Sequence, residues 1–596
     1  MVYFASIVVY LLLLGCIGVY KARQVKTEDD FEVAGRTLSP WIMVCTMLAV
    51  WIGTGSIVGN AEKTYEVGFA ALLLPVGTFI GMILLALIAS KARDIEANTV
   101  PEVIGGRFGQ TARSLSVVSL IIAYMVIVSY QFNAGGAVLE VITGDKDAVM
   151  LKAGDELSPT QLRKGRVIFR PSEDWTGDVE IGFKAPGGAE TGLTYKIGVT
   201  NAENIIEAKK AVAEVDNSVA IKPNNYARIK VNPETLEGEL FTISSMPENG
   251  TLELVEPVLT AKKATIIAAV CIIIYTMLAG LMSLAYTDIV TGTLITVVMI
   301  VSFVLYWFKA GGWSGMEAAY AAMGDKPQHM QLLGVFTGKD IINFCLPVFL
   351  LVLGDANQYQ RIFASKNAKS ARSAVVVMIF LALAVELLII GCAWMAASMT
   401  PDPEDGKYIL IYAAKEFMPL PLGCLFMVTV IGIIISTADS FLLVPATTFM
   451  RDIYLNFINP KASTKRILIL SRLMVIVFGI IAYFVTRAFA DSTGFFKKAL
   501  YAFTIYGASI TPSLVAAITW PRATKAGSVS SILVGVIIAL VWSEAAFIQK
   551  IDALKGFDAV LPAIFMSVLC LVVVSLLTEN KPDDAQITEQ AETPGQ

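Results

Sequence analysis

The chain has 596 residues, of which 55% are hydrophobic and 16% charged, with a formal net charge of −4 at pH 7. A soluble chain carries about 25% charged residues, so this composition indicates that much of the chain lies in a lipid bilayer. The lack of a basic cluster argues against a nucleic acid partner, and a single histidine, His329, in a connector expected to be solvated argues against histidine-based catalysis.

Apolar segments long enough to cross a bilayer recur along the chain, since a membrane helix needs about 20 mostly apolar residues. Thirteen segments qualify, which predicts an all-α polytopic membrane protein with about thirteen transmembrane helices. They lie near residues 3–20, 40–60, 68–90, 114–142, 263–284, 289–308, 341–355, 373–397, 419–447, 467–486, 499–519, 528–545 and 558–577.

The first segment is expected to be a retained helix, not a signal peptide, because it lacks a basic leader and a small-residue cleavage site and is followed directly by basic residues. Its N-terminus then lies outside the cell. The basic connectors near residues 91–113, 361–372 and 451–466 fall in the cytoplasm, as the positive-inside rule requires of a protein of the cell (inner) membrane. The polar tail at 578–596 is also expected to be cytoplasmic and disordered.

The second segment contains the sequence Ala49-Val-Trp-Ile-Gly-Thr-Gly-Ser-Ile-Val-Gly. Gly53, Gly55 and Gly59 weaken a helix in the middle of the membrane. A helix broken there frees backbone carbonyls, which are good ligands for a hard cation. Glycine pairs also occur where two membrane helices pack closely, so this cluster by itself leaves both readings open.

Residues 145–258 contain no spanning segment, and they separate helices at 1–144 from helices at 259–577. Alternating patterns with turn signals at 165–171, 178–183 and 249–254 predict β-strands. Gly165-x-Val-x-Phe-x-Pro followed by Asp174-Trp-Thr-Gly resembles cadherin-like β-sandwich modules of bacterial surface proteins. We therefore expect a β-sandwich inserted on the extracytoplasmic side, either as a cap or contact module for a surface partner or as a domain that captures a ligand.

Several spans in the middle and end of the chain carry carboxylates. Asp288 is expected to open the sixth span, as a helix cap or as part of a cation site. The seventh span is short and ends at Gly354 and Asp355, which predicts a broken helix. Glu386 in the eighth span faces either a polar partner or a proton pathway, and Glu544 is expected at the membrane interface.

The ninth span contains Ser436-Thr-Ala-Asp-Ser, a run of hydroxyls and one carboxylate directly after three isoleucines. Adjacent hydroxyls and a carbonyl one turn earlier can complete an oxygen shell around a cation. Serine and threonine in membrane helices also bond to the carbonyl four residues earlier. The joint occurrence of this run and the glycines of the second span favours a cation site.

Motifs along nearly the whole chain, except residues 145–258, resemble the sodium:solute symporter family. They are Asp30-Phe-Glu-Val-Ala-Gly-Arg-Thr-Leu-Ser, Trp51-Ile-Gly-Thr-Gly-Ser, Thr99-Val-Pro-Glu, Ala285-Tyr-Thr-Asp, Tyr359-Gln-Arg, Ser436-Thr-Ala-Asp-Ser and Arg451-Asp-Ile-Tyr. The resemblance implies a LeuT-type core of five plus five helices in inverted repeats, formed by spans two to six and seven to eleven.

The resemblance also implies a Na⁺ site made of the backbone carbonyls of Ala49, Ile52 and Ile433 and the hydroxyls of Ser436 and Thr437. Na⁺ would be the coupling ion.

A second cation site or exit path is expected at Asp288, Asp439 and Ser440, because unpaired carboxylates in the membrane are costly.

The solute is expected to be a small amino acid, a carboxylate or a vitamin-like molecule, bound near Thr54, Ser56, Pro75, Gly354 and Asp355. A sugar is less favoured, because sugar-transporting relatives carry aromatic residues shortly before the Gln-Arg pair, where this chain has two aliphatic residues.

The sequence thus predicts a secondary active transporter, not an enzyme, that carries Na⁺ and a small organic solute into the cell by alternating access. A proton-coupled transporter is one alternative. A membrane sensor that uses residues 145–258 as its ligand domain is another, but the expected 578–596 tail offers no output module.

Overall fold

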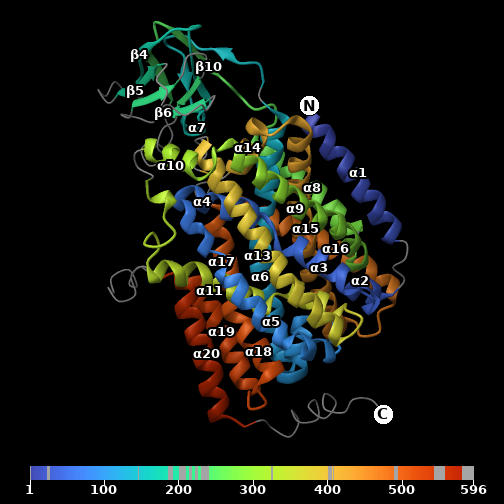
Figure 1. The fold of residues 1–596 in the computed structure, drawn as a ribbon. Helices are drawn as coiled ribbons and strands as arrows, with labels where there is room; N and C mark the ends of the chain where they lie inside the picture. Colours follow the sequence, from blue (N-terminus) through green and yellow to red (C-terminus); the bar gives the residue numbers. More distant parts are fainter. Residues whose placement is uncertain are drawn as a thin grey trace.

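The computed structural model describes residues 2–22, 27–144, 146–184, 192–200, 210–213, 218–221, 226–229, 240–278, 280–323, 327–399, 406, 408–488, 494–542 and 557–579 (Figure 1). The expectations for Glu544 and for the tail from residue 580 onward lie outside these residues.

The described residues form a bundle of helices with a β-rich region at one end (Figure 1). The helices of the bundle are α1 (Val2–Ala22), α2 (Glu28–Val33), α3 (Pro40–Trp51), α4 (Ala61–Val67), α5 (Val76–Asp94), α6 (Val100–Thr143), α8 (Ala261–Leu278), α9 (Leu281–Lys309), α10 (Gly312–Ala322), α11 (Gly338–Gly354), α12 (Ala356–Phe363), α13 (Ala368–Met399), α14 (Ile409–Phe417), α15 (Leu420–Phe449), α16 (Thr464–Ala488), α17 (Phe495–Ser509), α18 (Thr511–Thr519), α19 (Lys525–Val541) and α20 (Val560–Leu577). Short 3₁₀ and π segments join some of them, namely η1 (Ala34–Arg36), η2 (Gly55–Asn60), η3 (Gly68–Leu73), η5 (Pro327–Met330) and η6 (Met450–Ile458).

Eleven helices in the described part of the chain are long and apolar enough to cross a membrane. The number becomes twelve if α3 and the segment Gly55–Leu73, which are bent by 54° relative to each other, count as one span. The apolar helix α19 is shorter than these. Each of the thirteen predicted segments contains a helix, but the predicted number of spans is not confirmed.

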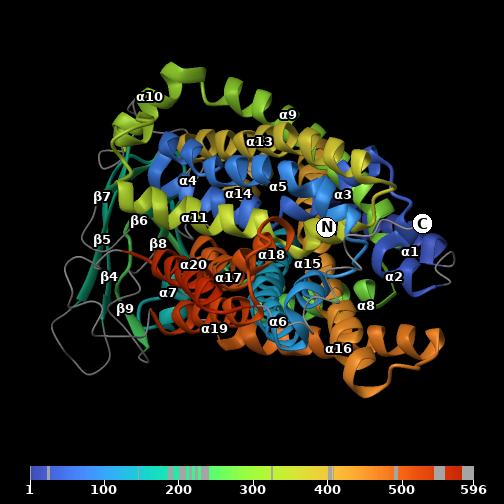
Figure 2. The same ribbon diagram turned by 90° about the horizontal axis from the view of Figure 1, so that it is seen from below.

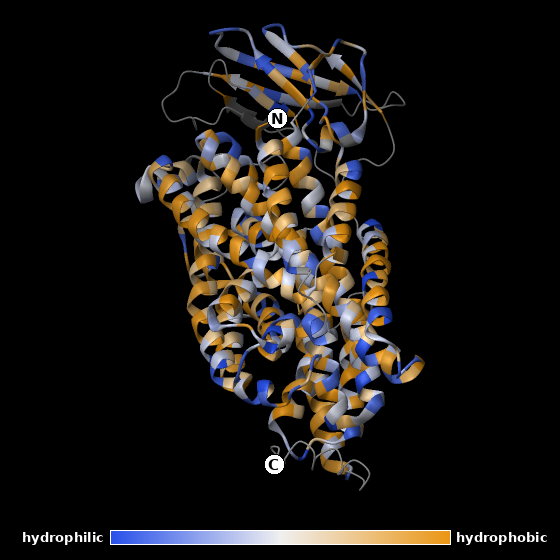
Figure 3. Cartoon of the chain, turned by 90° about the vertical axis from the view of Figure 1, so that its right-hand side faces the viewer, coloured by the Kyte–Doolittle hydropathy of each residue, from blue (hydrophilic) through white to orange (hydrophobic). Residues whose placement is uncertain are grey.

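Two helices form the centre of the bundle. In an apolar stretch of 18 residues in each span, 78% of the residues are buried in α6 and 72% in the span that begins with α15. The corresponding fractions are 22% in α1 and 28% in α20. Figure 2 shows α6 and α15 in the interior and α1, α9 and α16 at the edge. Hydrophobic residues prevail along the helices in Figure 3, as expected where the outer face meets lipid tails.

The boundary between the fifth and sixth predicted spans lies earlier than expected. Helix α8 ends at Leu278 and α9 begins at Leu281, after Gly280 in an extended conformation (φ −148°, ψ 176°). Asp288 therefore lies about two turns inside α9. The prediction that it opens or caps the helix is wrong, because the apolar residues from Leu281 onward continue the helix through it.

The connector that contains His329 folds back onto the bundle. His329 is 2% exposed, stacks on the ring of Tyr320 and donates from Nε2 to the carbonyl of Tyr65 at 3.0 Å. A Cβ atom on Gly68 would lie 2.4 Å from the Cα atom of His329, so only glycine permits this close approach. The prediction that His329 is solvated is wrong, because its connector packs on η3 rather than looping into water.

The β-rich region contains two five-stranded sheets, with the strand orders β1-β10-β3-β8-β6 and β2-β9-β4-β5-β7. Its elements are β1 (Val149–Met150), β2 (Glu156–Leu157), α7 (Pro159–Arg163), β3 (Val167–Pro171), β4 (Gly177–Lys184), β5 (Gly192–Val199), β6 (Lys210–Ala213), β7 (Ser218–Ile221), β8 (Tyr226–Ile229), β9 (Phe241–Ser245) and β10 (Gly250–Leu254).

Side chains from both sheets share one hydrophobic core, which makes the region a sandwich. The three predicted strands are found as β3, β4 and β10. The ends of the region meet where the Val258 amide donates to the Gly144 carbonyl at 2.9 Å. The region lies at the end of the bundle where α1 begins (Figures 1 and 3).

Candidate functional site

The helix that begins with α3 breaks in the interior of the bundle. At the break, Ile52 leaves the helical conformation (φ −75°, ψ 87°), and the Gly53 amide donates to the Trp51 carbonyl at 3.0 Å instead of to the Ala49 carbonyl four residues earlier. The chain then continues as the π segment η2. The break therefore turns backbone carbonyls of α3 towards neighbouring helices.

Helix α15 presents two hydroxyls to these carbonyls. The Ser436 Oγ lies 3.3 Å from the Ala49 carbonyl, and the Thr437 Oγ1 lies 3.4 Å from the Ala49 carbonyl and 3.5 Å from the Val50 carbonyl. A Cβ atom on Gly53 would lie 2.9 Å from Thr437 Oγ1, so glycine at this position allows the two elements to approach. The structure thus brings Ala49, Ser436 and Thr437 together.

The other two residues of the predicted Na⁺ site lie close by in the chain. Ile52 is the residue at which α3 breaks, and Ile433 lies one turn before Thr437 on α15. Both are fully buried. Carbonyl and hydroxyl oxygens are the donors that hard cations prefer, so the residues at this break fit Na⁺ chemically.

An ion pair lies next to these hydroxyls. Asp288 on α9 accepts from Ser436 Oγ at 2.6 Å and from the Thr46 hydroxyl, and its Oδ2 lies 3.7 Å from the Arg361 guanidinium. Arg361 is fully buried and also donates to Ser440 at 2.8 Å. Asp288 is therefore partly compensated by Arg361 and is connected to the proposed ion site through Ser436.

Asp439 adds a second carboxylate to this network. It is 1% exposed, it interacts electrostatically with Asp288 and Arg361, and its Oδ1 has no hydrogen-bond partner among the described residues. If all three groups are ionised, two carboxylates face one guanidinium. The network then carries one negative charge in excess, which a passing cation would offset.

A second break separates α11 from α12 at Gly354 and Asp355, which confirms the predicted broken helix. The Tyr506 hydroxyl donates to the Gly354 carbonyl at 2.8 Å and accepts from the Ala356 amide at 3.0 Å. The Tyr124 hydroxyl donates a hydrogen bond to the carboxylate of Asp355, which also caps the N-terminus of α12. Side chains of the protein therefore satisfy the polar groups of this break.

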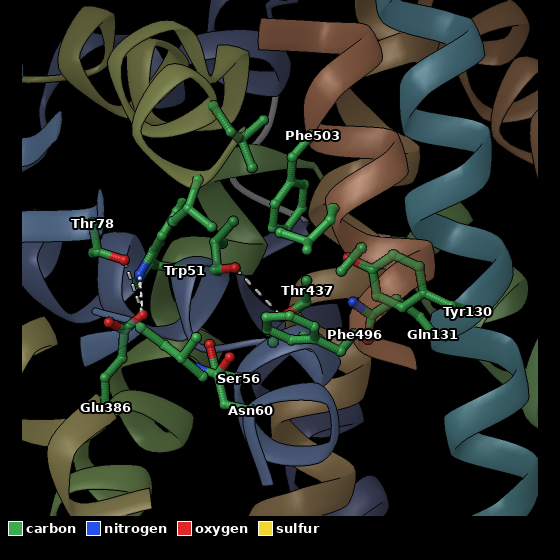
Figure 4. Close-up of a pocket in the computed structure, with 18 of the residues that line it drawn as sticks. Trp51, Ser56, Asn60, Thr78, Tyr130, Gln131, Glu386, Thr437, Phe496 and Phe503 are labelled. Atoms are coloured by element: carbon green, nitrogen blue, oxygen red, sulfur yellow. Dashed lines mark hydrogen bonds between the residues drawn. The ribbon is translucent and has the colours of Figure 1, made fainter. Parts of the chain in front are cut away.

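A cavity of about 60 Å³ lies beside the first break (Figure 4). This volume corresponds to a few water molecules, which limits the site to a small solute unless the walls move. Its walls include the aromatic side chains of Trp51, Phe441, Phe496 and Phe503. Its polar lining consists of Ser56, Asn60, Thr78, Tyr130, Gln131, Glu386 and Thr437.

The residues predicted to bind the solute have different places relative to this cavity. Ser56 lines it, and the Thr54 hydroxyl donates to the amide oxygen of the lining residue Gln131. Pro75, Gly354 and Asp355 are not among the residues that line it.

Sequence reasoning missed the polar cavity residues Asn60, Thr78, Tyr130 and Gln131, and it missed Arg361 in the ion pair. Arg361 stood within a quoted motif and was expected in a basic cytoplasmic connector. That expectation is wrong for this residue, because α12 buries its side chain and pairs it with Asp288. The available signal was a polar or charged side chain within an apolar helix, which is costly in a membrane unless it has a partner or faces a cavity. Glu386 had been noted on this ground, and the structure gives it two polar partners, Trp51 and Thr78.

An apolar bundle in which two helices break around a polar centre with a cavity is typical of secondary transporters. The model of the "Sodium:solute symporter family" matches residues 31–151 and 255–535, so the chain belongs to this family of transporters, whose coupling ion is Na⁺. The unmatched residues between these blocks contain strands β2 to β10.

Curated relatives include proline transporters of bacteria. The chain is 23% identical over 57% of its length to the osmoregulated proline transporter OpuE of Bacillus subtilis, and 26% identical over 54% to the high-affinity proline transporter PutP of the same organism. It is 25% identical over 53% to a sodium/proline symporter of Haemophilus influenzae. The matches cover 68%, 66% and 63% of these relatives, so the chain spans about two thirds of their length.

Solved structures confirm the fold. A Na⁺-coupled sialic acid symporter in a substrate-bound outward-open state matches with a TM-score of 0.65 and 14% identity, over 97% of this chain and 98% of that chain. The nucleobase-cation-symport-1 family transporter Mhp1 in a closed conformation matches with a TM-score of 0.51 and 10% identity, over 94% and 98% of the two chains. The chain is therefore a multi-pass membrane protein with the fold of LeuT-type transporters.

Proposed function

We propose that the protein is a symporter that couples the entry of Na⁺ to the uptake of a small organic solute by alternating access. The observation that carries this proposal is that Thr437 belongs to both the proposed ion site and the cavity wall. Its hydroxyl faces the carbonyls at the break of α3, and the same residue lines the cavity. An ion bound at the hydroxyl would therefore change one wall of the solute cavity, which is the requirement for coupling.

The Na⁺ ion would be held by the carbonyls of Ala49, Ile52 and Ile433 and the hydroxyls of Ser436 and Thr437. In the structure the two hydroxyls approach the Ala49 carbonyl only weakly, at 3.3 and 3.4 Å. A cation between them would replace these long hydrogen bonds with ion–oxygen contacts, and the hydroxyls would turn their lone pairs towards the ion.

The network of Asp288, Asp439 and Ser440 would form a second cation site or the exit path for Na⁺. Ser436 supports this role because it touches both the Ala49 carbonyl and the Asp288 carboxylate. An ion that leaves the first site would meet the excess negative charge of this network. Arg361 would limit that charge and allow the ion to leave.

The solute would bind in the cavity beside the first break, in contact with Ser56 and Gln131. Thr54 would act indirectly, because its hydroxyl holds the Gln131 side chain. Pro75, Gly354 and Asp355 do not line this cavity and are not part of the proposed solute site. An amino acid, a carboxylate or a vitamin-like molecule remains the proposed class, and the proline transporters among the relatives favour the first.

We further propose that the five-plus-five inverted repeat comprises spans two to six and seven to eleven, in a bacterial cell membrane. The N-terminus and residues 145–258 would lie outside and the C-terminus in the cytoplasm. The β-sandwich would then be a cap or a contact module for a surface partner at the outer end of the bundle. Its ends meet at Gly144 and Val258, which fits an insertion into a loop.

The membrane potential and the Na⁺ gradient would drive accumulation of the solute. One charge moving through 100 mV supplies about 2.3 kcal/mol. Since 1.4 kcal/mol is a factor of ten, one Na⁺ per solute supports roughly 50-fold accumulation from the electrical term alone.

Solute uptake into proteoliposomes with and without an inward Na⁺ gradient tests the proposal. A panel of radiolabelled amino acids, carboxylates and sugars is offered to the purified full chain. We expect uptake of one class to rise with the Na⁺ gradient and to fall when choline replaces Na⁺. Equal uptake in Na⁺ and choline media would contradict Na⁺ coupling.

A further inference from the structure

The cavity contains two polar atoms that the protein leaves without a hydrogen-bond partner. Within the described residues these are the Oε2 atom of Glu386 and the Nε2 atom of Gln131, and both residues line the cavity. Glu386 is 3% exposed and Gln131 is fully buried. A buried polar group without a partner is costly, so each atom marks a place where a ligand group is expected.

Glu386 is held by one of its two oxygens. Its Oε1 accepts from the Trp51 indole at 2.9 Å and from the Thr78 hydroxyl at 3.4 Å, and both donors belong to the cavity wall (Figure 4). Two donors on the same oxygen orient the carboxylate and leave Oε2 as an acceptor. Because Glu386 lines the cavity, a group bound there is a candidate partner for this atom.

Gln131 is held in the complementary way. Its amide oxygen accepts from the Thr54 hydroxyl, which leaves the NH₂ group as a donor. Figure 4 shows Gln131 and Glu386 on opposite sides of the cavity. The cavity therefore presents a negatively charged acceptor at one side and a neutral donor at the other.

The charge of Glu386 has no counter-charge in the wall. Among the described residues that line the cavity, Glu386 is an acid and none is Lys, Arg or His. An isolated carboxylate in a buried site is expensive unless a cation pairs with it. A protonated amine on the ligand would supply that cation together with N–H donors.

We infer that the cavity binds a small amino acid-like zwitterion, with its protonated amine on Glu386 Oε2 and its carboxylate on Gln131 Nε2. The inference rests on the proposed function, because it assigns the solute class of the proposed transport cavity. A zwitterion leaves the single negative charge of Glu386 uncompensated, and a Na⁺ ion at Thr437 offsets it. Na⁺ therefore brings the net charge of the site to zero, and the amine of the solute supplies the direct partner of Glu386.

The remaining walls fit the body of such a solute. Phe441, Phe496 and Phe503 supply apolar surface in the same cavity, and Trp51 offers an aromatic ring next to the carboxylate. An aromatic face near an ammonium group adds a cation–π attraction. A small apolar side chain or a ring is therefore accommodated, whereas a solute with hydroxyls all round, such as a sugar, is not.

The test compares Glu386→Gln with wild type in proteoliposomes containing the full chain. The probes are L-proline, its oxygen analogue tetrahydrofuran-2-carboxylate, which lacks the amine, and pyrrolidine, which lacks the carboxylate. We expect wild type to bind L-proline at least tenfold more tightly than either analogue. Glu386→Gln keeps an oxygen for Trp51 and Thr78 but removes the charge, and it raises the half-saturating concentration of L-proline roughly 10- to 100-fold.

Two further variants complete the design. Gln131→Leu removes the donor and is expected to weaken L-proline binding while leaving pyrrolidine binding unchanged. Glu66→Gln is the matched control, since Glu66 is an exposed carboxylate of α4 that pairs with Lys63 outside the cavity. It is expected to transport L-proline as wild type does.

Each outcome decides the inference. It is overturned if Glu386→Gln binds L-proline as tightly as wild type, or if wild type prefers tetrahydrofuran-2-carboxylate or a sugar to L-proline. Na⁺ binding, followed by the change in tryptophan fluorescence on Na⁺ titration, reports folding of each variant independently of the solute. If uptake is the same with and without Na⁺ but still differs among the probes, Na⁺ coupling is refuted and the assignment of Glu386 stands.

Discussion

Two helices break in the interior of this bundle, and the two breaks are treated in opposite ways. At the α11–α12 break, the Tyr506 hydroxyl bridges the Gly354 carbonyl and the Ala356 amide, and Tyr124 bonds to Asp355. At the α3 break, the carbonyls of Ala49 and Val50 meet the hydroxyls of α15 at 3.3 to 3.5 Å, and a cavity lies alongside. The α11–α12 break is closed by the protein, and the α3 break is open to a ligand.

The difference shows that two similar helix breaks in a membrane protein can serve different purposes, one as part of the scaffold and one as a binding site. A backbone carbonyl in the membrane must find a donor or a cation, because no bulk water reaches it. Where a tyrosine supplies the partner, the break is part of the scaffold. Where only long hydrogen bonds are present, an ion can take their place, so the break can serve as a binding site.

Arg361 connects the two breaks, and its removal should have the largest effect. It follows the second break on α12 and reaches Thr46 on α3 and Asp288 on α9. Arg361→Ala leaves a buried carboxylate without its cation and is expected to lower stability by about 3–5 kcal/mol. Thermal unfolding in detergent measures the loss. Arg361→Lys, which keeps the charge, should recover part of it, and an Arg361→Ala variant as stable as wild type would contradict the pairing.

Removing both hydroxyls at the open break should abolish tight Na⁺ binding. In the double variant Ser436→Ala with Thr437→Ala, two of the five proposed ligands are lost, and the half-maximal Na⁺ concentration for uptake should rise about 10- to 100-fold. Thr429→Ala is the control, since this hydroxyl of the same helix donates to the Leu425 carbonyl within α15. An unchanged Na⁺ dependence would show that the ion binds elsewhere.

Removing the tyrosine hydroxyl at the closed break should affect stability and not Na⁺. Tyr506→Phe leaves the Gly354 carbonyl and the Ala356 amide unsatisfied, at a cost of about 1–3 kcal/mol. Thermal unfolding in detergent should record this loss, while the half-maximal Na⁺ concentration stays within twofold of wild type. Tyr20→Phe on the exposed face of α1 is the control. A Na⁺ affinity that falls with Tyr506→Phe would mean that the two breaks do not differ as described.

The glycine at the open break offers a finer test. A Cβ atom on Gly53 would lie 2.8 Å from the Thr437 Cγ2 atom, so Gly53→Ala must push Thr437 away from the carbonyls. We expect the half-maximal Na⁺ concentration to rise severalfold, with a smaller effect than that of the double variant. Gly15→Ala on α1, whose Cβ meets open space, is the matched control. Equal Na⁺ dependence in both variants would argue against the close approach.

Deleting the β-sandwich should have the smallest effect on either break. Residues 145–258 can be replaced by a short Gly-Ser linker because Gly144 and Val258 already touch. The deletion removes the ion pair between Arg166 and Glu140, so a slight loss of stability is expected. Na⁺ dependence and solute affinity in proteoliposomes should not change. A weaker solute affinity would instead indicate that the sandwich captures solute.

Much of the fold could be predicted because its signals are local. Apolar segments of membrane length, the strands at β3, β4 and β10, and the break at Gly354 can each be read from a few neighbouring residues. The run at Ser436 and the glycines at 53 and 55 likewise marked the centre. The boundary between the fifth and sixth spans was predicted too late in the chain. The sequence around Gly280 is apolar on both sides, so nothing local marks the extended glycine at which one helix ends and the next begins.

The sequence by itself determined that this chain lies in a membrane, that it belongs to one family of transporters, and which residues could bind a cation. Only the tertiary structure decided which polar groups remain open. Tyr506 closes the break at Gly354 from a helix about 150 residues away, and Thr54 sets the orientation of Gln131 on another helix. A polar group in the membrane takes its role from its partner, and partners that distant in sequence meet only when the helices pack.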